Sequence, residues 1–138
     1  MLKIKVRKIN KIIIHCTATP PHLDIGVEDV DRWHKQKGWK GIGYHYLIDL
    51  RGHIYRGRED NEIGAHVRGH NRNSIGVVYV GGVDANGEQK DTRTDDQKLA
   101  LRGLIDNLNR RYPDATVHGH NEFTNNKACP SFNVKYEL

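Results

Sequence analysis

Residues 11–16, Lys11-Ile12-Ile13-Ile14-His15-Cys16, form the stretch of sequence that decides the fold. Three consecutive β-branched residues favour a strand, and a short, uninterrupted apolar run is typical of a buried one. Side chains alternate between the two faces of a strand, so His15 and Cys16 are expected to point in opposite directions. If His15 serves a polar site, Cys16 is better interpreted as a small buried apolar residue.

Outward from this strand, the chain alternates between strand-like and helix-like segments. Further strands are expected at residues 44–50, 53–58, 75–80 and 115–118, and helices at residues 27–37 and from the Thr94–Gln97 capping box to Pro113. The order β-α-β-β-β-α-β predicts an α/β fold, with a central mixed β-sheet flanked by α-helices.

The length of 138 residues fits a single domain spanning residues 1–138 and suffices for a buried core. No apolar run reaches the roughly 20 residues of a membrane helix, and the basic N-terminus lacks the apolar block of a signal peptide. We therefore expect cytoplasmic synthesis and no membrane insertion. The net charge of +5 suits an anionic partner, but the Lys and Arg residues are scattered, so nucleic-acid binding is not predicted.

Nine histidines and two cysteines raise the question of a metal site. Most of the histidines have an ordinary interpretation, and His34 is expected to pack on the apolar face of the first helix. His15 and His120 differ because they end or follow predicted strands, where distant segments converge, and Cys129 lies nine residues after His120. Two His and one Cys match the three protein ligands of a catalytic zinc site. The spacing matches no local zinc motif, so separate structural roles for the three residues stay open.

Six motifs around these residues occur in order and cover about residues 12–132 of the chain. They are His15-Cys16-Thr17-Ala18-Thr19; Trp33-His34-Lys35 with Gly38-Trp39; Gly43-Tyr44-His45-Tyr46; Gly64-Ala65-His66; Asn71-Arg72-Asn73-Ser74-Ile75-Gly76-Val77; and Lys127-Ala128-Cys129-Pro130-Ser131-Phe132. Together they resemble the zinc-dependent N-acetylmuramoyl-L-alanine amidases, in particular the bacteriophage lysozyme branch, which shares its fold with peptidoglycan recognition proteins.

This resemblance implies an enzyme that hydrolyses the amide bond between N-acetylmuramic acid and L-alanine in peptidoglycan. It places one zinc ion on His15, His120 and Cys129, and catalytic roles on Tyr44 and Lys127. Recognition proteins that only bind peptidoglycan characteristically lack the Cys ligand, so Cys129 favours an enzyme. The polar loop before the strand at residues 75–80 is expected to line the substrate groove, unless it is an ordinary surface loop. The candidate groove residues are His66, Arg68, Asn71 and Asn73.

Two other functions stay open at this point. One is a peptidoglycan-binding module without activity. The other is a regulatory protein that contacts a phage RNA polymerase, for which the basic arm from Lys3 to Lys11 is a candidate surface. For an enzyme without a signal peptide, the resemblance implies a monomeric phage or prophage endolysin that reaches the wall after release. Recycling of wall fragments in the cytoplasm is the alternative setting.

Overall fold

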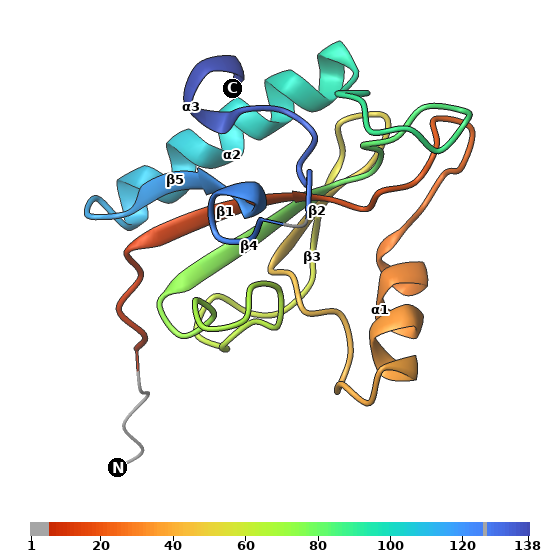
Figure 1. The fold of residues 1–138 in the computed structure, drawn as a ribbon. Helices are drawn as coiled ribbons and strands as arrows, with labels where there is room; N and C mark the ends of the chain where they lie inside the picture. Colours follow the sequence, from red (N-terminus) through yellow and green to blue (C-terminus); the bar gives the residue numbers. More distant parts are fainter. Residues whose placement is uncertain (1–5, 126) are drawn as a thin grey trace.

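The computed structural model describes residues 6–125 and 127–138 (Figure 1). The strands are β1 (Lys11–Cys16), β2 (Tyr46–Ile48), β3 (Ile54–Arg56), β4 (Ser74–Tyr79) and β5 (Thr116–Gly119). The helices are α1 (Val27–Gln36), α2 (Asp95–Arg111), the 3-10 turn η1 (His120–Glu122) and the short α3 (Val134–Glu137). The strands form one sheet in the order β3-β2-β4-β1-β5.

The sheet is mixed, as the sequence predicted. β1 lies between β4 and β5 and is parallel to both, and β2 is parallel to β4. Only β3 at the edge is antiparallel to its neighbour, β2. The isoleucine strand is thus central, which explains why Ile12, Ile13 and Ile14 are fully buried.

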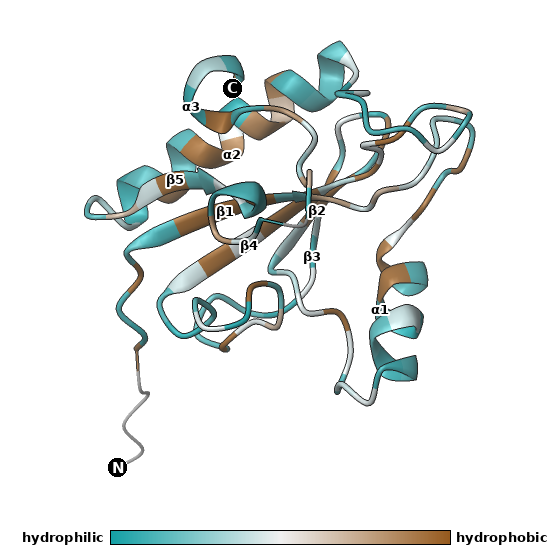
Figure 2. Cartoon of the chain, viewed as in Figure 1, coloured by the Kyte–Doolittle hydropathy of each residue, from teal (hydrophilic) through white to brown (hydrophobic). Residues whose placement is uncertain are grey.

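Helices cover both faces of the sheet (Figures 1 and 2). On one face, Ile12, Ile14 and Cys16 pack with α2, whose contribution includes Leu101 and Leu108. On the other face, a smaller cluster joins Val30 of α1 to residues of β2 and β4. Because Cys16 faces α2, the alternation along β1 turns His15 toward the α1 side, so the two side chains point in opposite directions, as predicted.

The β2–β3 hairpin is confirmed, but its regular pairing is shorter than the sequence suggested. The backbone beyond β2 and β3 still pairs, since Arg58 N–H donates to the Tyr44 carbonyl and His45 N–H to the Gly76 carbonyl. At Tyr44, therefore, the backbone is still hydrogen-bonded, but it lies outside the regular antiparallel pairing of β2 and β3. The hydrophobic pattern does not show where regular pairing ends, because burial continues beyond the last regular bond of a strand.

The start of α2 follows the predicted capping box. Gln97 N–H donates to the Thr94 hydroxyl at 3.0 Å, and the Gln97 side chain accepts from Thr94 N–H at 2.9 Å. The helix ends at Arg111, two residues before Pro113. Across the described residues, none of the helices combines the length and the apolar character that a membrane span requires.

Candidate metal centre

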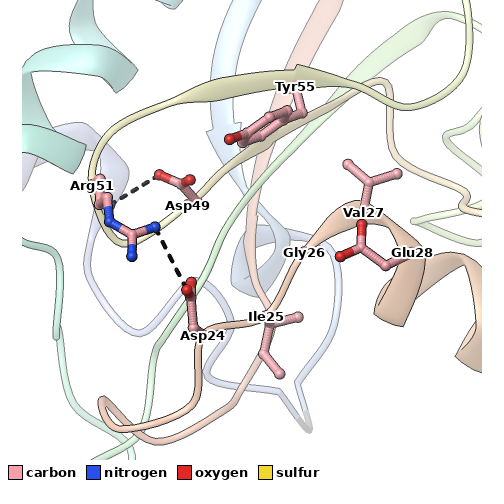
Figure 3. A pocket seen from close by; sticks show the side chains of 8 residues that line it. All are labelled: Asp24, Ile25, Gly26, Val27, Glu28, Asp49, Arg51 and Tyr55. Carbon is pink, nitrogen blue, oxygen red and sulfur yellow. Dashed lines mark hydrogen bonds and ion pairs between the residues drawn. The ribbon is translucent and has the colours of Figure 1, made fainter.

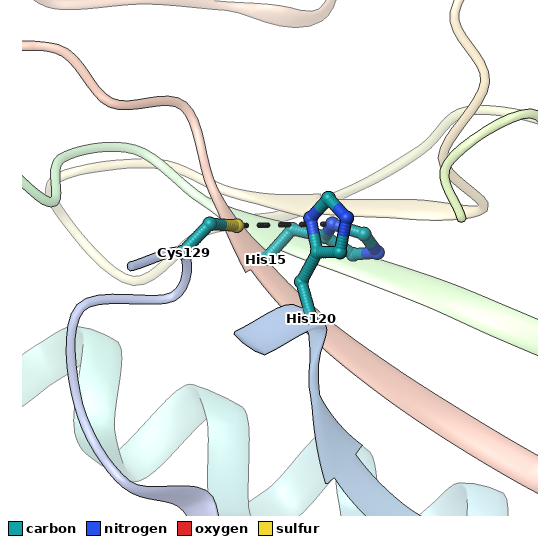
Figure 4. Close-up of side chains that lie close together, drawn as sticks. All are labelled: His15, His120 and Cys129. Carbon is teal, nitrogen blue, oxygen red and sulfur yellow. Dashed lines mark hydrogen bonds between the residues drawn. The ribbon is translucent and has the colours of Figure 1, made fainter. Parts of the chain in front are cut away.

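Three segments that are distant in sequence meet at one end of β1. His15 lies near the end of that strand, and His120 begins η1 directly after β5, the parallel neighbour of β1. The two imidazole rings are 4.7 Å apart between centroids. The loop after η1 brings Cys129 over the strand end, where Cys16 N–H donates to its sulfur at 3.2 Å. The parallel pairing of β1 and β5 therefore builds the cluster shown in Figure 4.

The donor set of this cluster fits a zinc ion. One ligand atom each from His15, His120 and Cys129 lies within 4.8 Å of the other two. Ligands bonded to tetrahedral zinc at about 2.0–2.3 Å are about 3.6 Å apart. The Cys129 Sγ and His15 Nδ1 atoms are separated by 3.8 Å, so little movement is needed to close around an ion. Two imidazoles and a thiolate are also the ligand types that zinc prefers.

The protonation states of the two histidines favour a metal. Burial, reinforced by His66, His120 and Lys127, holds the pKa of His15 well below its usual range. Burial and the charge of Lys127 also lower the pKa of His120. Both rings are thus neutral at neutral pH and keep a lone pair for a cation. A hydrogen bond to Cys16 and burial raise the pKa of the Cys129 thiol, so its thiolate needs a cation beside it.

Tyr44 and Lys127 border the same cluster. The Tyr44 ring lies 5.0 Å from His15 and 5.5 Å from His34 between centroids. Burial and the nearby Cys129 raise the pKa of the Tyr44 phenol, which keeps it protonated as a hydrogen-bond donor. Lys127 is exposed, and its positive charge is felt by both His15 and His120.

The four loop residues expected to line the groove have different surroundings. Arg68 is exposed, while Asn71 accepts from the backbone N–H groups of His66 and Val67 at 2.9 and 2.8 Å. The Asn73 amide donates to the Lys8 carbonyl at 2.8 Å. Asn71 thus holds the loop together at His66 and Val67, and Asn73 ties it to the segment at Lys8.

The His66 side chain is half-buried and turns toward His15 and Ser74. Its Nδ1 lies 2.9 Å from His15 Nε2, and its Nε2 lies 3.2 Å from the Ser74 hydroxyl. Sequence reasoning missed this contact with a candidate ligand. The local signal that could have indicated it is the pair Gly64 and Gly76, because a side chain at either position would meet the His66 ring.

Two pockets lie beside α1. A pocket of about 150 Å³ adjoins Tyr44 and is lined by Thr17, Val30, Trp33, His34, Lys37 and Tyr44. His34 is buried there, and its Nδ1 accepts from Gly43 N–H at 2.8 Å, which confirms it as a packing residue. A second pocket of about 270 Å³ surrounds the start of α1, where Arg51 approaches Asp24 at 3.6 Å (Figure 3). This second pocket includes neither the three candidate ligands nor Tyr44.

The comparisons with known proteins agree with this architecture. The N-acetylmuramoyl-L-alanine amidase family model matches residues 5–132, and the chain belongs to that family. It is 41% identical over 124 residues to the endolysin of Escherichia phage T7, a match that covers 90% of this chain and 82% of that protein.

Solved structures extend the similarity to the fold. The amidase LysC of Clostridium intestinale URNW superimposes with a TM-score of 0.82 at 30% identity, covering 95% of this chain and 82% of that one. Bumblebee peptidoglycan recognition protein SA superimposes with a TM-score of 0.79 at 26% identity, covering 99% and 89%. The protein is therefore an N-acetylmuramoyl-L-alanine amidase, an enzyme whose substrate is peptidoglycan, built on the fold that recognition proteins also use.

Proposed function

We propose that this amidase works through one zinc ion held by His15, His120 and Cys129, with Tyr44 and Lys127 as its catalytic residues. The observation that carries the proposal is the convergence of two imidazoles and one thiol at the end of β1, where one ligand atom of each lies within 4.8 Å of the other two. A bound zinc ion supplies Lewis-acid activation of the amide carbonyl and of water. Two neutral imidazoles and one thiolate leave such a site with a net charge of about +1, which favours a developing oxyanion.

Lys127 and Tyr44 supply a positive charge, a proton donor and a hydrogen-bond donor, which the three ligands do not. Attack on an amide carbonyl builds negative charge on its oxygen, and the exposed ammonium of Lys127 can approach that oxygen from the solvent side. The same ammonium can donate a proton to the departing amine of L-alanine. The Tyr44 phenol stays protonated because burial raises its pKa, so it orients water or the carbonyl by donating a hydrogen bond.

Substrate binding is proposed for the surface around this centre. Arg68 is exposed on the loop before β4, where its guanidinium can pair with a stem-peptide carboxylate. His66, Asn71 and Asn73 support the wall of the groove through the contacts described above. The pocket beside Tyr44 adds an aromatic group from α1, Trp33, and a cationic group from the residue that follows the helix, Lys37.

The biological setting proposed for the enzyme is lysis by a phage or prophage. Relatives that carry the name endolysin come from several phages, including Klebsiella phage KP32 at 40% identity. A monomer suffices for this role, because all five residues of the proposed centre come from one chain. Recycling of wall fragments uses the same chemistry on soluble muropeptides, and it is the second setting. Regulation of a polymerase by the basic arm stays a prediction, and Lys3 and Lys5 of that arm lie outside the described residues.

The test of the proposal is digestion of purified sacculi followed by mass spectrometry. We expect free stem peptides with L-alanine at their amino end, and loss of this release when a chelator removes the metal. Cys129→Ala should lose both zinc and activity. Full release by metal-free Cys129→Ala protein would refute the zinc mechanism. Faster cleavage of soluble muropeptides than of sacculi would favour recycling over lysis.

A further inference from the structure

The inner side of the candidate metal centre contains a short chain of hydrogen bonds. His15 Nδ1 lies 3.8 Å from the Cys129 sulfur, whereas the other ring nitrogen, Nε2, lies 2.9 Å from His66 Nδ1. His66 Nε2 in turn lies 3.2 Å from the hydroxyl of Ser74, which is fully buried in β4. The chain therefore runs from the candidate ligand into the sheet.

The direction of each hydrogen bond follows from the metal. A ligating nitrogen must offer a lone pair, so His15 would bind through Nδ1 and carry its proton on Nε2. That N–H then donates to His66 Nδ1, which must be unprotonated. A neutral His66 carries its own proton on Nε2 and donates it to the Ser74 hydroxyl. Each histidine is thus assigned one tautomer, and the chain leaves no ring nitrogen without a partner.

The fold provides a fitted slot for the His66 ring. A Cβ atom on Gly76 of β4 would lie 2.7 Å from ring atoms of His66, and one on Gly64 would also lie 2.7 Å from the ring. Contacts this short are not tolerated, so both positions must lack a side chain for the ring to lie there. His45 packs edge-on against His66 at 5.9 Å between centroids, and the His45 Nδ1 accepts from Gly76 N–H at 3.0 Å. The ring is therefore held in place from several sides.

We propose that His66 is a positioning residue for the metal site: it accepts the His15 Nε2–H bond and so presents His15 Nδ1 to the ion. This inference rests on the proposed zinc site, and it assigns to His66 a role other than contact with substrate. Partners of this kind orient a metal-bound imidazole and raise its basicity. Their removal typically weakens metal affinity by about 10- to 100-fold.

The first experiment measures zinc affinity by competition with a chromophoric chelator. His66→Ala removes the acceptor, and we expect its zinc dissociation constant to rise by about 10- to 100-fold. His66→Asn places an amide oxygen near the position of Nδ1, so it should recover much of that loss. His53→Ala is the matched control, because it removes an exposed histidine from the turn before β3. Thermal unfolding in excess chelator reports the stability of the metal-free variants separately.

The outcomes distinguish the proposals. Wild-type zinc affinity in His66→Ala, with zinc lost in His15→Ala, would overturn the positioning role and leave the zinc site intact. Zinc retained by His15→Ala would instead refute the site itself. A purely structural role for His66 would lower metal-free stability without changing zinc affinity.

A second measurement needs no variant. Nitrogen-15 NMR of the zinc-loaded wild-type protein reports which ring nitrogen of each histidine carries a proton. We expect protons on Nε2 of both His15 and His66. A proton found on Nδ1 of His66 would overturn the proposal, even if the variants fail to fold.

Discussion

Replacing Lys127 with alanine should slow the chemical step while the metal stays bound. The ammonium is exposed, but its charge lowers the pKa of both His15 and His120, so it lies within Coulombic reach of the reacting atoms. Two unit charges about 4 Å apart interact by about 4 kcal/mol at an effective dielectric constant of about 20. A single oxyanion donor contributes about 2.7–4 kcal/mol in well-studied enzymes. Because solvent screens Lys127, we expect the lower end, a fall in kcat of about 100-fold.

The assay is the initial rate of stem-peptide release from sacculi at saturating substrate, with zinc content measured by mass spectrometry on the same samples. Lys127→Arg keeps the charge and should retain more activity than Lys127→Ala. Lys98→Ala removes an exposed lysine on α2, the helix that covers the opposite face of the sheet, and should match the wild type. A Lys127→Ala enzyme with full zinc and a kcat within about threefold of wild type would refute the reasoning.

Four further predictions concern the ligands, the phenol, pH and the core. Cys129→Ser should lose most of its zinc, whereas Cys16→Ala should keep it, because Cys16 is a core residue that faces α2. Equal zinc content in the two proteins would contradict the assignment of Cys129 as a ligand. Tyr44→Phe keeps the ring and removes the hydroxyl, so kcat should fall on the order of 100-fold with zinc unchanged, as measured by the same release assay. Burial lowers the pKa of His45 to about 4, so the unfolded chain binds more protons at this residue between about pH 6.5 and 4. As the pH drops through that window, His45 alone should lower the free energy of unfolding by up to about 3 kcal/mol. Urea titrations across the window should show a shallower slope for His45→Asn. Leu108→Ala deletes a fully buried side chain of α2 and should cost about 2–5 kcal/mol in urea unfolding, and a loss below about 1 kcal/mol would contradict its place in the core.

Local patterns in the sequence account for much of the framework. The β-branched run of β1, the Thr94–Gln97 capping box and the apolar stripe of α2 each act over a few residues, and each appears in the structure as expected. The opposite orientation of His15 and Cys16 is equally local, because alternation along a strand does not depend on what packs around it.

At the level of the sequence, the resemblance to amidases, and not the spacing, joins His15, His120 and Cys129 into one candidate centre. Nothing in the local pattern states that β5 pairs in parallel with β1, and this pairing places His120 beside His15. Such contacts link residues about a hundred positions apart, and hydrophobic periodicity indicates the type of each element without stating which distant strands pair.

His66 shows the same limit most clearly. Its loop is polar and rich in glycine, which predicts an exposed groove. The ring instead packs against β4 at Gly76, because Gly64 and Gly76 leave space for it and because His15 and Ser74 supply partners. The sequence by itself therefore determined which segments form the main strands and helices and that His15 and Cys16 point in opposite directions, since these depend on short-range sterics and alternation. Only the tertiary structure decided which distant side chains meet around His15, since that depends on strand order and on the space left between packed elements.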